Sequence, residues 1–444
     1  MNEKRKSLWM VGALCGLGAL RVFLAAITPF AADFHGSIQY GQLILDGVRP
    51  GSIGVYLGPS YISAGTLALW ALLTHDPAVR MNLFLVYVEG PNVAGSLVTP
   101  EMYAFTLVMK IPVLITDFLT LLAIILIVKS TTRTLSKGLL AGLLWFTSPL
   151  VFLTENASLL ELYPALLILL GVYLLHRSKT AAGSGTLILG TLLRLAPALF
   201  TWIYLVGYAR CRQFRRLLIF LAVQVIFVLA AVFYLSSTTG WDSVVQILSG
   251  RPGIIIPEVL TTLGPFIKPM LGYNPYEIPM SFVFYLLLTY FLTKPQVWQN
   301  RSIGVEALAF FAPYYALTSF SIPFLLWGLP TLLVYSMTTR FGPTRFLTIT
   351  SLGFLTYLFE SSKSLMGAYG PTAVFFIPNM NSAMASFSAS MSQLYLIPLV
   401  PQTFRSLFSA SMLLVVFWIL KEKNIPLPSK SESGSHLSNE PNLN

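Results

Sequence analysis

Charged residues are scarce in this chain, and their scarcity sets the class of protein. Asp, Glu, Lys and Arg make up 10% of the 444 residues, whereas soluble domains carry about 25%. Hydrophobic residues make up 55%, and apolar runs recur from residue 8 to residue 420 without a long polar insertion. We therefore expect an integral membrane protein with one polytopic domain over residues 1–420. The first run lacks a small-residue cleavage site, which favours a retained span over a signal peptide.

Cysteine and the common catalytic motifs are also missing or nearly so. Cys15 and Cys211 are isolated thiols, which excludes a disulfide framework and a cysteine-ligated metal site. The sequence has no Walker motif, metal-type histidine cluster, serine triad or dinucleotide fingerprint. It also has no internal repeat of the kind that pairs the halves of a transporter. Individual ionisable residues must therefore carry the functional argument.

Lys and Arg outnumber Asp and Glu by 28 to 17, which gives a net charge of +11. Most of these cations lie in short loops and tails, at 4–6, 129–137, 177–179, 210–216, 294–301, 340–345 and 421–430. Basic clusters beside apolar spans are the pattern of the positive-inside rule, so we expect no nucleic-acid partner and place these clusters and the N-terminus in the cytoplasm. Residues 421–444, rich in Ser and Asn, are expected to form a disordered cytoplasmic tail.

The apolar runs predict an all-α chain with about ten to twelve membrane segments. The expected spans are 8–30, 103–128, 138–154, 158–175, 217–236, 280–293, 303–320, 322–338, 345–360 and 404–420. Residues 61–74 are too short to cross and favour an interfacial helix. Residues 184–207 have basic clusters at both ends, so we expect Arg194 and Pro197 to divide them into two half-helices.

The opposite side of the membrane is predicted to hold most of the acids. They are Asp33, Asp46, Asp76, Glu89, Glu101, Glu155, Glu161, Asp242, Glu258, Glu277 and Glu360. Asp33 follows the first span directly. A carboxylate there can take a proton from a sugar hydroxyl or hold a divalent cation beside a phosphate. It can equally be a solvated loop acid or the cap of a helix over 36–45, and chemistry alone leaves these alternatives open.

Ionisable residues inside the expected spans are costly and therefore informative. They are Arg21, Lys110, Asp117, Arg194 and Glu306. Lys110 and Asp117 are seven residues apart, on one helix face, and for Asp117 we favour a structural pair within the membrane. Arg194, at the expected helix break, is a candidate ligand of an anionic head group.

Cations on the outer side are candidates for binding a phosphate leaving group. These are Arg251, Lys268, Lys363 and Arg405. For each of them, simple snorkelling of a long side chain towards the interface is the alternative interpretation.

Several of these elements occur in an order that resembles a known family. The series comprises Asp33, Tyr40, Leu45, Gly47, Pro50 and Tyr56, the short segment 61–74, Lys110 to Asp117, Ser148-Pro149 to Glu161, Leu193 to Pro197, and Ser319 to Pro330 with Phe324 to Trp327. It is similar to glycosyltransferases of the GT-C fold that use polyprenyl- or dolichyl-phosphate sugars. The nearest likeness is to the glycosylphosphatidylinositol mannosyltransferase I type and its prokaryotic relatives. The chain departs from that pattern in having Ala31 and His35 in place of a second acid, Glu161 in place of an aspartate and Arg194 in place of a lysine.

The resemblance implies transfer of a hexose, most simply mannose, from a lipid phosphate to an acceptor hydroxyl on the outer or lumenal face, with inversion. Asp33 would be the catalytic base, and His35, Glu161, Arg194, Arg251 and Arg405 would bind substrate. A divalent cation, Mg²⁺ or Mn²⁺, is an optional cofactor. The partners would be the lipid-linked donor, a lipid- or glycan-linked acceptor and the bilayer, in a prokaryotic plasma membrane or the endoplasmic reticulum. The alternatives are a lipid or solute transporter (or flippase) and a non-catalytic subunit of a glycosylation complex.

Overall fold

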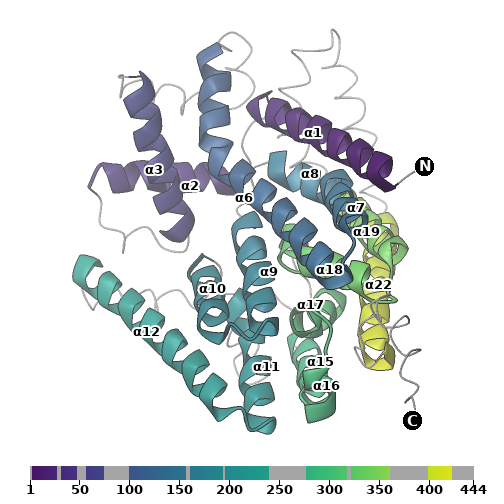
Figure 1. Cartoon of the computed structure of the whole chain (residues 1–444). Coiled ribbons are helices and arrows are strands. Elements are labelled where there is room, and N and C mark those ends of the chain that lie inside the picture. Colours follow the sequence, from purple (N-terminus) through teal and green to yellow (C-terminus); the bar gives the residue numbers. More distant parts are fainter. Residues whose placement is uncertain are drawn as a thin grey trace, which may run out of the picture.

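The computed structural model describes residues 3–27, 32–47, 57–74, 100–156, 161–193, 196–239, 277–317, 322–360 and 399–422. Within these ranges every regular element is a helix, so the predicted all-α class is confirmed (Figure 1). In chain order the elements are α1 (Glu3–Ile27), α2 (Ala32–Leu45), α3 (Leu57–Thr74), α6 (Pro100–Thr132), α7 (Leu135–Thr147), α8 (Pro149–Asn156), α9 (Leu162–His176), α10 (Thr180–Leu193), α11 (Ala196–Arg210), α12 (Phe214–Thr239), α15 (Glu277–Leu292), α16 (Pro295–Gln299), α17 (Val305–Leu317), η2 (Ile322–Trp327), α18 (Leu329–Thr338), α19 (Pro343–Glu360) and α22 (Leu399–Glu422). The first two residues of the expected tail 421–444 end helix α22, and residues 423–444 lie outside the described residues.

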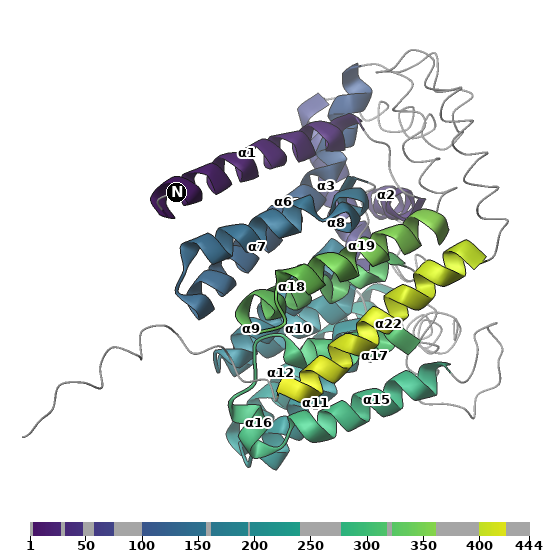
Figure 2. The ribbon, with the colours of Figure 1, turned by 90° about the vertical axis from the view of Figure 1, so that its right-hand side faces the viewer.

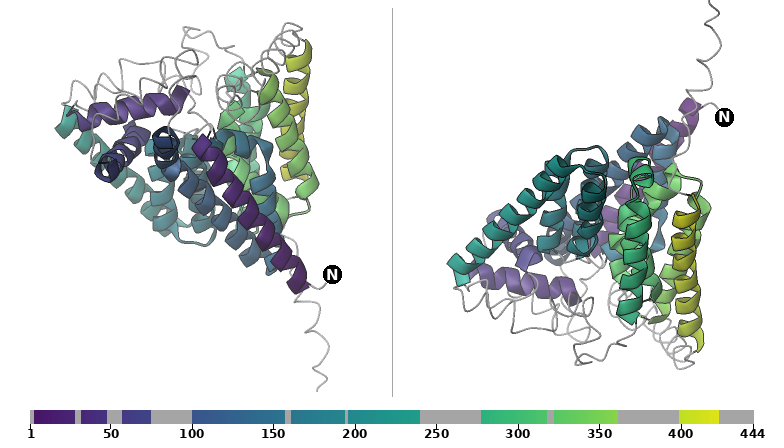
Figure 3. Two further views of the ribbon diagram at one scale, coloured as in Figure 1. Left: turned by 90° about the horizontal axis from the view of Figure 1, so that it is seen from above. Right: turned by 90° about the horizontal axis from the view of Figure 1, so that it is seen from below.

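Four helices of the described chain are long and apolar enough to cross a membrane, namely α1, α6, α12 and α22. Shorter apolar helices such as α9, α15 and α17 pack among them. Seen from above and below, α12 and α22 lie at opposite edges of the array (Figure 3). The apolar side chains of α12 are largely exposed, among them Leu218, Ile226 and Phe233. Exposed apolar surface of this extent is typical of a membrane protein.

Tight basic turns gather at one end of the array. Arg133, Ser178 and Arg212 lie one or two residues after helices α6, α9 and α11 and have φ values of 56°, 62° and 56°. This left-handed conformation closes a helix and reverses the chain within a few residues. Figure 2 shows these turns on the same side as the N-terminus of α1. The cations in or beside them are Lys129, Arg133, Lys137, Arg177, Lys179, Arg210, Arg212, Arg215 and Arg216. This side is called the basic end below.

Several acids occupy the opposite ends of the helices. Glu101 lies in the first turn of α6, a helix that finishes at the basic end beside Lys129. Glu277 begins α15, which runs towards Lys294, and Glu360 ends α19, which starts between Arg340 and Arg345. The end that carries these acids is called the acidic end below.

Two expected spans are divided, and the prediction of single segments there was wrong. The segment 138–154 is broken at Ser148, whose ψ of 116° is extended because a proline follows it. The segment 322–338 consists of the 3₁₀ helix η2 and the helix α18, with Gly328 between them. The short helix α16 also replaces part of the expected loop 294–301.

The predicted division of 184–207 is confirmed. Helix α10 ends at Leu193 and α11 begins at Ala196, with Pro197 in its first turn. Proline is tolerated there because the amide hydrogens of a first turn have no partner within the helix.

Small residues allow α9 and α10 to pack closely. A Cβ on Gly171 would lie 2.6 Å from Leu187, and one on Gly183 would lie 2.6 Å from Leu175. Without a hydrophobic driving force between helices in lipid, such close approach supplies much of the association energy.

Hydrogen bonds join α12 to α10 across the same region. The Gln224 amide donates to the Ser184 hydroxyl over 3.0 Å, and that hydroxyl donates to the Phe220 carbonyl over 3.0 Å. Polar side chains between apolar helices stabilise their pairing by about 0.6 to 2 kcal/mol each.

Candidate functional site

The helix that carries Asp33 is held in place by α3. Gly41 of α2 approaches the backbone of α3 so closely that a Cβ there would lie 2.8 Å from the Ala64 nitrogen. One turn earlier, the buried hydroxyls of Ser37 and Ser63 form a 3.0 Å hydrogen bond. Small residues and the contact between these hydroxyls therefore help to fix how α2 lies on α3.

Asp33 and His35 both lie in the first turn of α2, which begins at Ala32. Of the alternatives left open for Asp33, a loop acid and a cap of a helix over 36–45 therefore do not agree with the position of its backbone. A carboxylate in a first turn interacts favourably with the partial positive charge of the helix N-terminus. The side chains of Asp33 and His35 lie outside the described residues.

Glu161 is buried where α9 begins and pairs with an indole far away in the sequence. Its Oε2 accepts a 2.6 Å hydrogen bond from Nε1 of Trp327, the last residue of η2. The two side chains are 2% and 3% exposed. Because hydrogen bonds to a charged acceptor contribute about 1.5 to 3 kcal/mol, this contact is expected to hold η2 firmly against α9.

Besides Trp327, one tyrosine from another helix lies near this carboxylate. Tyr163 follows it in α9 and is buried, and Tyr315 of α17 interacts with it electrostatically. Helix α9 has 15 residues and ends in the basic turn at Arg177, so Glu161 lies about 22 Å from that turn, at the acidic end. Asp33 follows α1, whose first residues Lys4 to Lys6 mark the basic end. Glu161 and the helix of Asp33 are therefore at the same end of the array.

The three candidate phosphate-binding arginines are only partly described. Arg194 lies between α10 and α11, and Arg251 lies between α12 and α15, both outside the described residues. Arg405 is half-buried in the second turn of α22 and takes part in further contacts. Within the described ranges no three His, Cys, Asp or Glu side chains converge as metal ligands do.

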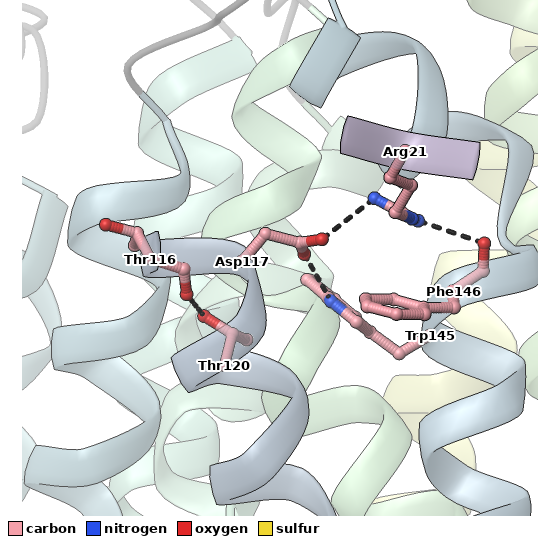
Figure 4. Close-up of polar contacts among 6 residues, drawn as sticks. All are labelled: Arg21, Thr116, Asp117, Thr120, Trp145 and Phe146. Atoms are coloured by element: carbon pink, nitrogen blue, oxygen red, sulfur yellow. Dashed lines mark hydrogen bonds and ion pairs between the residues drawn. The ribbon is translucent and has the colours of Figure 1, made fainter. Parts of the chain in front are cut away.

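A second polar cluster lies between α1, α6 and α7 (Figure 4). Arg21 Nη1 donates to Asp117 Oδ2 over 2.9 Å, and Trp145 Nε1 donates to Asp117 Oδ1 over 2.7 Å. Arg21 Nη2 donates to the Phe146 carbonyl over 2.9 Å, and the guanidinium lies 4.4 Å from the centroid of the Phe146 ring. Arg21 and Asp117 are 1% and 0% exposed.

This cluster agrees with the structural pair favoured for Asp117. Each carboxylate oxygen accepts one hydrogen bond, and the positive charge of Arg21 balances the negative charge. Paired, hydrogen-bonded ions of this kind fix helices relative to one another. The pair also secures the helix from which the chain leads to Asp33. Lys110, on the same helix as Asp117, is buried as well and has interactions of its own.

Cys211 marks the basic turn between α11 and α12. Burial raises the pKa of its thiol, and the nearby charges of Arg301 and Arg210 only partly offset the effect. The thiol is therefore less ionised at neutral pH than a free cysteine, and less reactive towards electrophiles.

Sequence reasoning found the acids of these clusters but missed their partners. It singled out Glu161 and Asp117 without identifying Trp327 or Trp145 as donors. A tryptophan in an apolar run has no signature that distinguishes a core residue from a hydrogen-bond donor, so only the tertiary arrangement shows these roles.

No protein-family model matches this chain, and no curated protein matches it in sequence. A functional assignment therefore depends on the positions of the chain's own residues. The features that bear on it are the contrast between the two ends of the array and the carboxylates at the acidic end.

Proposed function

We propose that this chain is a multi-pass membrane glycosyltransferase of GT-C-like architecture. It moves a hexose, most simply mannose, from a polyprenyl or dolichyl phosphate to an acceptor hydroxyl. The observation that carries the proposal is the placement of Asp33 and Glu161 at the acidic end of an apolar helical array whose tight turns are basic. Lipid-borne donors are reached from the bilayer, so this chemistry needs no soluble nucleotide-binding domain.

In this proposal the basic end faces the cytoplasm, as the positive-inside rule favours. The helices α1, α6, α12 and α22 cross the bilayer, and the shorter apolar helices complete about ten to twelve segments. The acidic end then faces the periplasm or the lumen. The membrane is the plasma membrane in a prokaryote or the endoplasmic reticulum in a eukaryote.

The proposed reaction is a direct displacement with inversion. Asp33 accepts the proton of the acceptor hydroxyl while that oxygen bonds to the anomeric carbon of the donor. The bond from the anomeric carbon to the phosphate oxygen breaks, and the lipid phosphate departs with the bonding electrons. His35 binds the sugar near Asp33, and Arg194, Arg251 and Arg405 bind the departing phosphate. Glu161, with Oε2 fixed by Trp327, orients the substrate end of α9 and η2.

A transfer assay tests this proposal. Purified protein is reconstituted into liposomes with a radiolabelled polyprenyl-phosphate hexose and a panel of lipid and glycan acceptors. Wild-type protein is expected to release lipid phosphate and to label an acceptor, and Asp33→Asn is expected to lose at least about 100-fold of that rate because the base is missing.

Asp46 supplies the matched control. It lies just past the other end of α2, is exposed, and accepts a 2.8 Å hydrogen bond from Gln42. Asp46→Asn removes the same charge at the opposite end of the same helix, and this variant is expected to transfer at the wild-type rate. Near-normal transfer by Asp33→Asn, with unchanged size-exclusion behaviour, would rule out Asp33 as the base.

A transporter or lipid flippase is the second candidate, because ionisable residues buried among apolar helices often mark a transport pathway. The Arg21–Asp117 pair is the observation that favours it. Uptake or flipping of labelled lipid phosphate without sugar transfer, lost in Asp117→Asn, would support this candidate. If neither transfer nor transport occurs, the chain is better explained as a non-catalytic subunit.

A further inference from the structure

The basic end carries an exposed aromatic ring with two cations beside it. The ring belongs to Tyr290 in the last turn of α15, and this residue is 56% exposed. The guanidinium carbon of Arg210, the last residue of α11, lies 4.7 Å from the ring centroid, and Nζ of Lys294 lies 5.8 Å from it. Figure 2 shows α15 running to α16 on the side where the N-terminus of α1 lies. Two positive charges from different parts of the chain therefore lie close to one another at the surface of the basic end.

Two sets of contacts hold Arg210 in this position. Its Nη1 donates to the Tyr290 carbonyl over 2.7 Å and to Oγ1 of Thr293 over 3.0 Å. One turn earlier on α11, Gly207 lies against the buried indole of Trp298 so closely that a Cβ there would lie 2.5 Å from the ring. Nη2 and Nε of Arg210 have no acceptor among the described residues. Arg210 is therefore a positioned cation that keeps donors for a ligand.

No described carboxylate balances these two charges. Within the described ranges neither Arg210 nor Lys294 forms an ion pair, and Glu306, the acid nearest to Lys294 along the chain, is buried and paired with Arg301. Arg212 is exposed in the same turn as Arg210 and adds a third positive charge. This surface is therefore strongly positive and suited to an anionic ligand.

An apolar face of α15 leads directly to the two cations. Val283, Leu286 and Leu287 are 47%, 41% and 50% exposed. Together with Tyr290 they follow the spacing i, i+3, i+4 and i+7, which places them on one side of the helix. The face extends about 10 Å from the ring towards the acidic end. A phosphate held by the cations would bring an acyl chain attached to it alongside this face.

The chemistry of the surface favours one kind of occupant. Guanidinium groups bind phosphate oxygens through two parallel hydrogen bonds, and the flexible lysine stem can turn its ammonium towards the same anion. A tyrosine ring at this position is typical of the level of lipid head groups. A soluble phosphate would leave the apolar face of α15 uncovered. A second copy of the chain, related by a two-fold axis, would place like charges opposite each other.

We propose that Arg210, Lys294 and Tyr290 bind the head group of an anionic phospholipid in the leaflet at the basic end. The two cations hold the phosphate, and one acyl chain lies along Val283, Leu286 and Leu287. The site lies at the end opposite Asp33 and does not depend on glycosyl transfer, so either proposal can fail without the other.

Native mass spectrometry of the full-length protein in non-ionic detergent tests this proposal. Phosphatidylglycerol and phosphatidylcholine with identical acyl chains are titrated separately, and the affinity for the first bound lipid is measured. Phosphatidylglycerol is expected to bind several-fold more tightly. Because one cation near an anionic lipid surface contributes about a five-fold gain in affinity, Lys294→Gln is expected to weaken phosphatidylglycerol binding by about five-fold. Arg210→Gln combined with Lys294→Gln is expected to weaken it by more than about ten-fold.

The turn between α9 and α10 supplies the matched control. Arg177 and Lys179 are the same two residue types, are both exposed and also belong to the basic end. Arg177→Gln combined with Lys179→Gln therefore removes the same charge from the same side of the protein. This variant is expected to leave the affinity for phosphatidylglycerol nearly unchanged.

Four results would overturn the proposal. An equal loss in the control variant would show a general attraction of the basic end for anions, and equal binding of the two lipids would show that the charges do not select. Displacement of phosphatidylglycerol by an equal concentration of glycerol phosphate would identify a site for soluble phosphate. A lipid-free dimer that is lost in the double variant would identify a second copy as the occupant. If the double variant does not fold without the hydrogen bonds of Arg210, Lys294→Gln alone decides, since the Lys294 side chain makes no hydrogen bond to a described residue.

Discussion

Removing one partner of the Arg21–Asp117 pair should destabilise the protein more than removing both. Arg21→Met leaves the Asp117 carboxylate with the Trp145 hydrogen bond but without its counter-charge. Asp117→Leu leaves the guanidinium of Arg21 unbalanced and removes the acceptor of Trp145. The double variant removes both buried charges of the pair.

The contacts give the expected magnitudes. Breaking a buried pair by removing one ion costs about 3 to 5 kcal/mol, so Arg21→Met falls in that range. Asp117→Leu adds the unsatisfied indole of Trp145, about 1 to 3 kcal/mol, for a total of about 4 to 8 kcal/mol. The double variant keeps only the losses at Trp145 and at the Phe146 carbonyl, about 2 to 4 kcal/mol. The single effects together therefore exceed the effect of the double variant by at least about 3 kcal/mol.

The assay is the free energy of unfolding in mixed SDS and non-ionic detergent micelles, with helical circular dichroism as the readout. Arg5→Met is the control, since Arg5 lies on the same helix but is exposed. It is expected to change the free energy by less than about 0.5 kcal/mol. Additive single effects, or single variants as stable as the Arg5 control, would refute the structural role of the pair.

Three further perturbations test other parts of the structure. Burial raises the pKa of the Cys211 thiol, so its thiolate fraction is smaller than that of a free cysteine at any pH below that pKa. Maleimide labelling of Cys211 at pH 7.5 is therefore expected to be slower in the folded protein than in SDS-unfolded protein, and to accelerate as the pH is raised. Equal labelling rates in the two states would contradict this burial. Gly207→Ala places a methyl group against the buried indole that it faces and is expected to cost about 1 to 3 kcal/mol of unfolding free energy, whereas Gly65→Ala, with nothing within 4 Å of the new methyl, is expected to be neutral or stabilising. Trp327→Phe removes the indole donor to Glu161 and is expected to cost about 1.5 to 3 kcal/mol in the same assay; an unchanged unfolding curve would show that this hydrogen bond does not hold η2.

Apolar periodicity and charge clusters were sufficient to predict the helical class and most helix positions. The break between α10 and α11 was predictable because a proline and a basic cluster at each end gave two independent signals. The break at Ser148 was not anticipated, although Pro149 supplied the same backbone restriction. An apolar run with one proline is compatible with both a kinked span and two helices, and only packing decides between them.

The candidate site was less accessible to sequence reasoning. The acid Asp117 was predicted to have a structural partner, but Lys110 and Arg21 were equally available in the sequence. The choice of Arg21 depends on how α1 crosses α6, which brings together residues 96 positions apart. The same applies to Glu161 and Trp327, which are 166 positions apart. No local pattern encodes contacts of that separation.

The buried ion pairs also change how the charges of this chain should be counted for topology. The positive-inside rule concerns cations exposed in loops near the ends of spans. Arg301 was counted with the basic cluster 294–301, but its charge is buried against Glu306 and balanced by it. Lys294 is exposed, and among the described residues it is the cation of the turn between α15 and α17 that still bears on membrane orientation. The signal at this turn is therefore weaker than the sequence indicates, whereas the turn at 210–216 keeps its exposed arginines. The cytoplasmic assignment of the basic end consequently depends most on the hairpins α6–α7, α9–α10 and α11–α12.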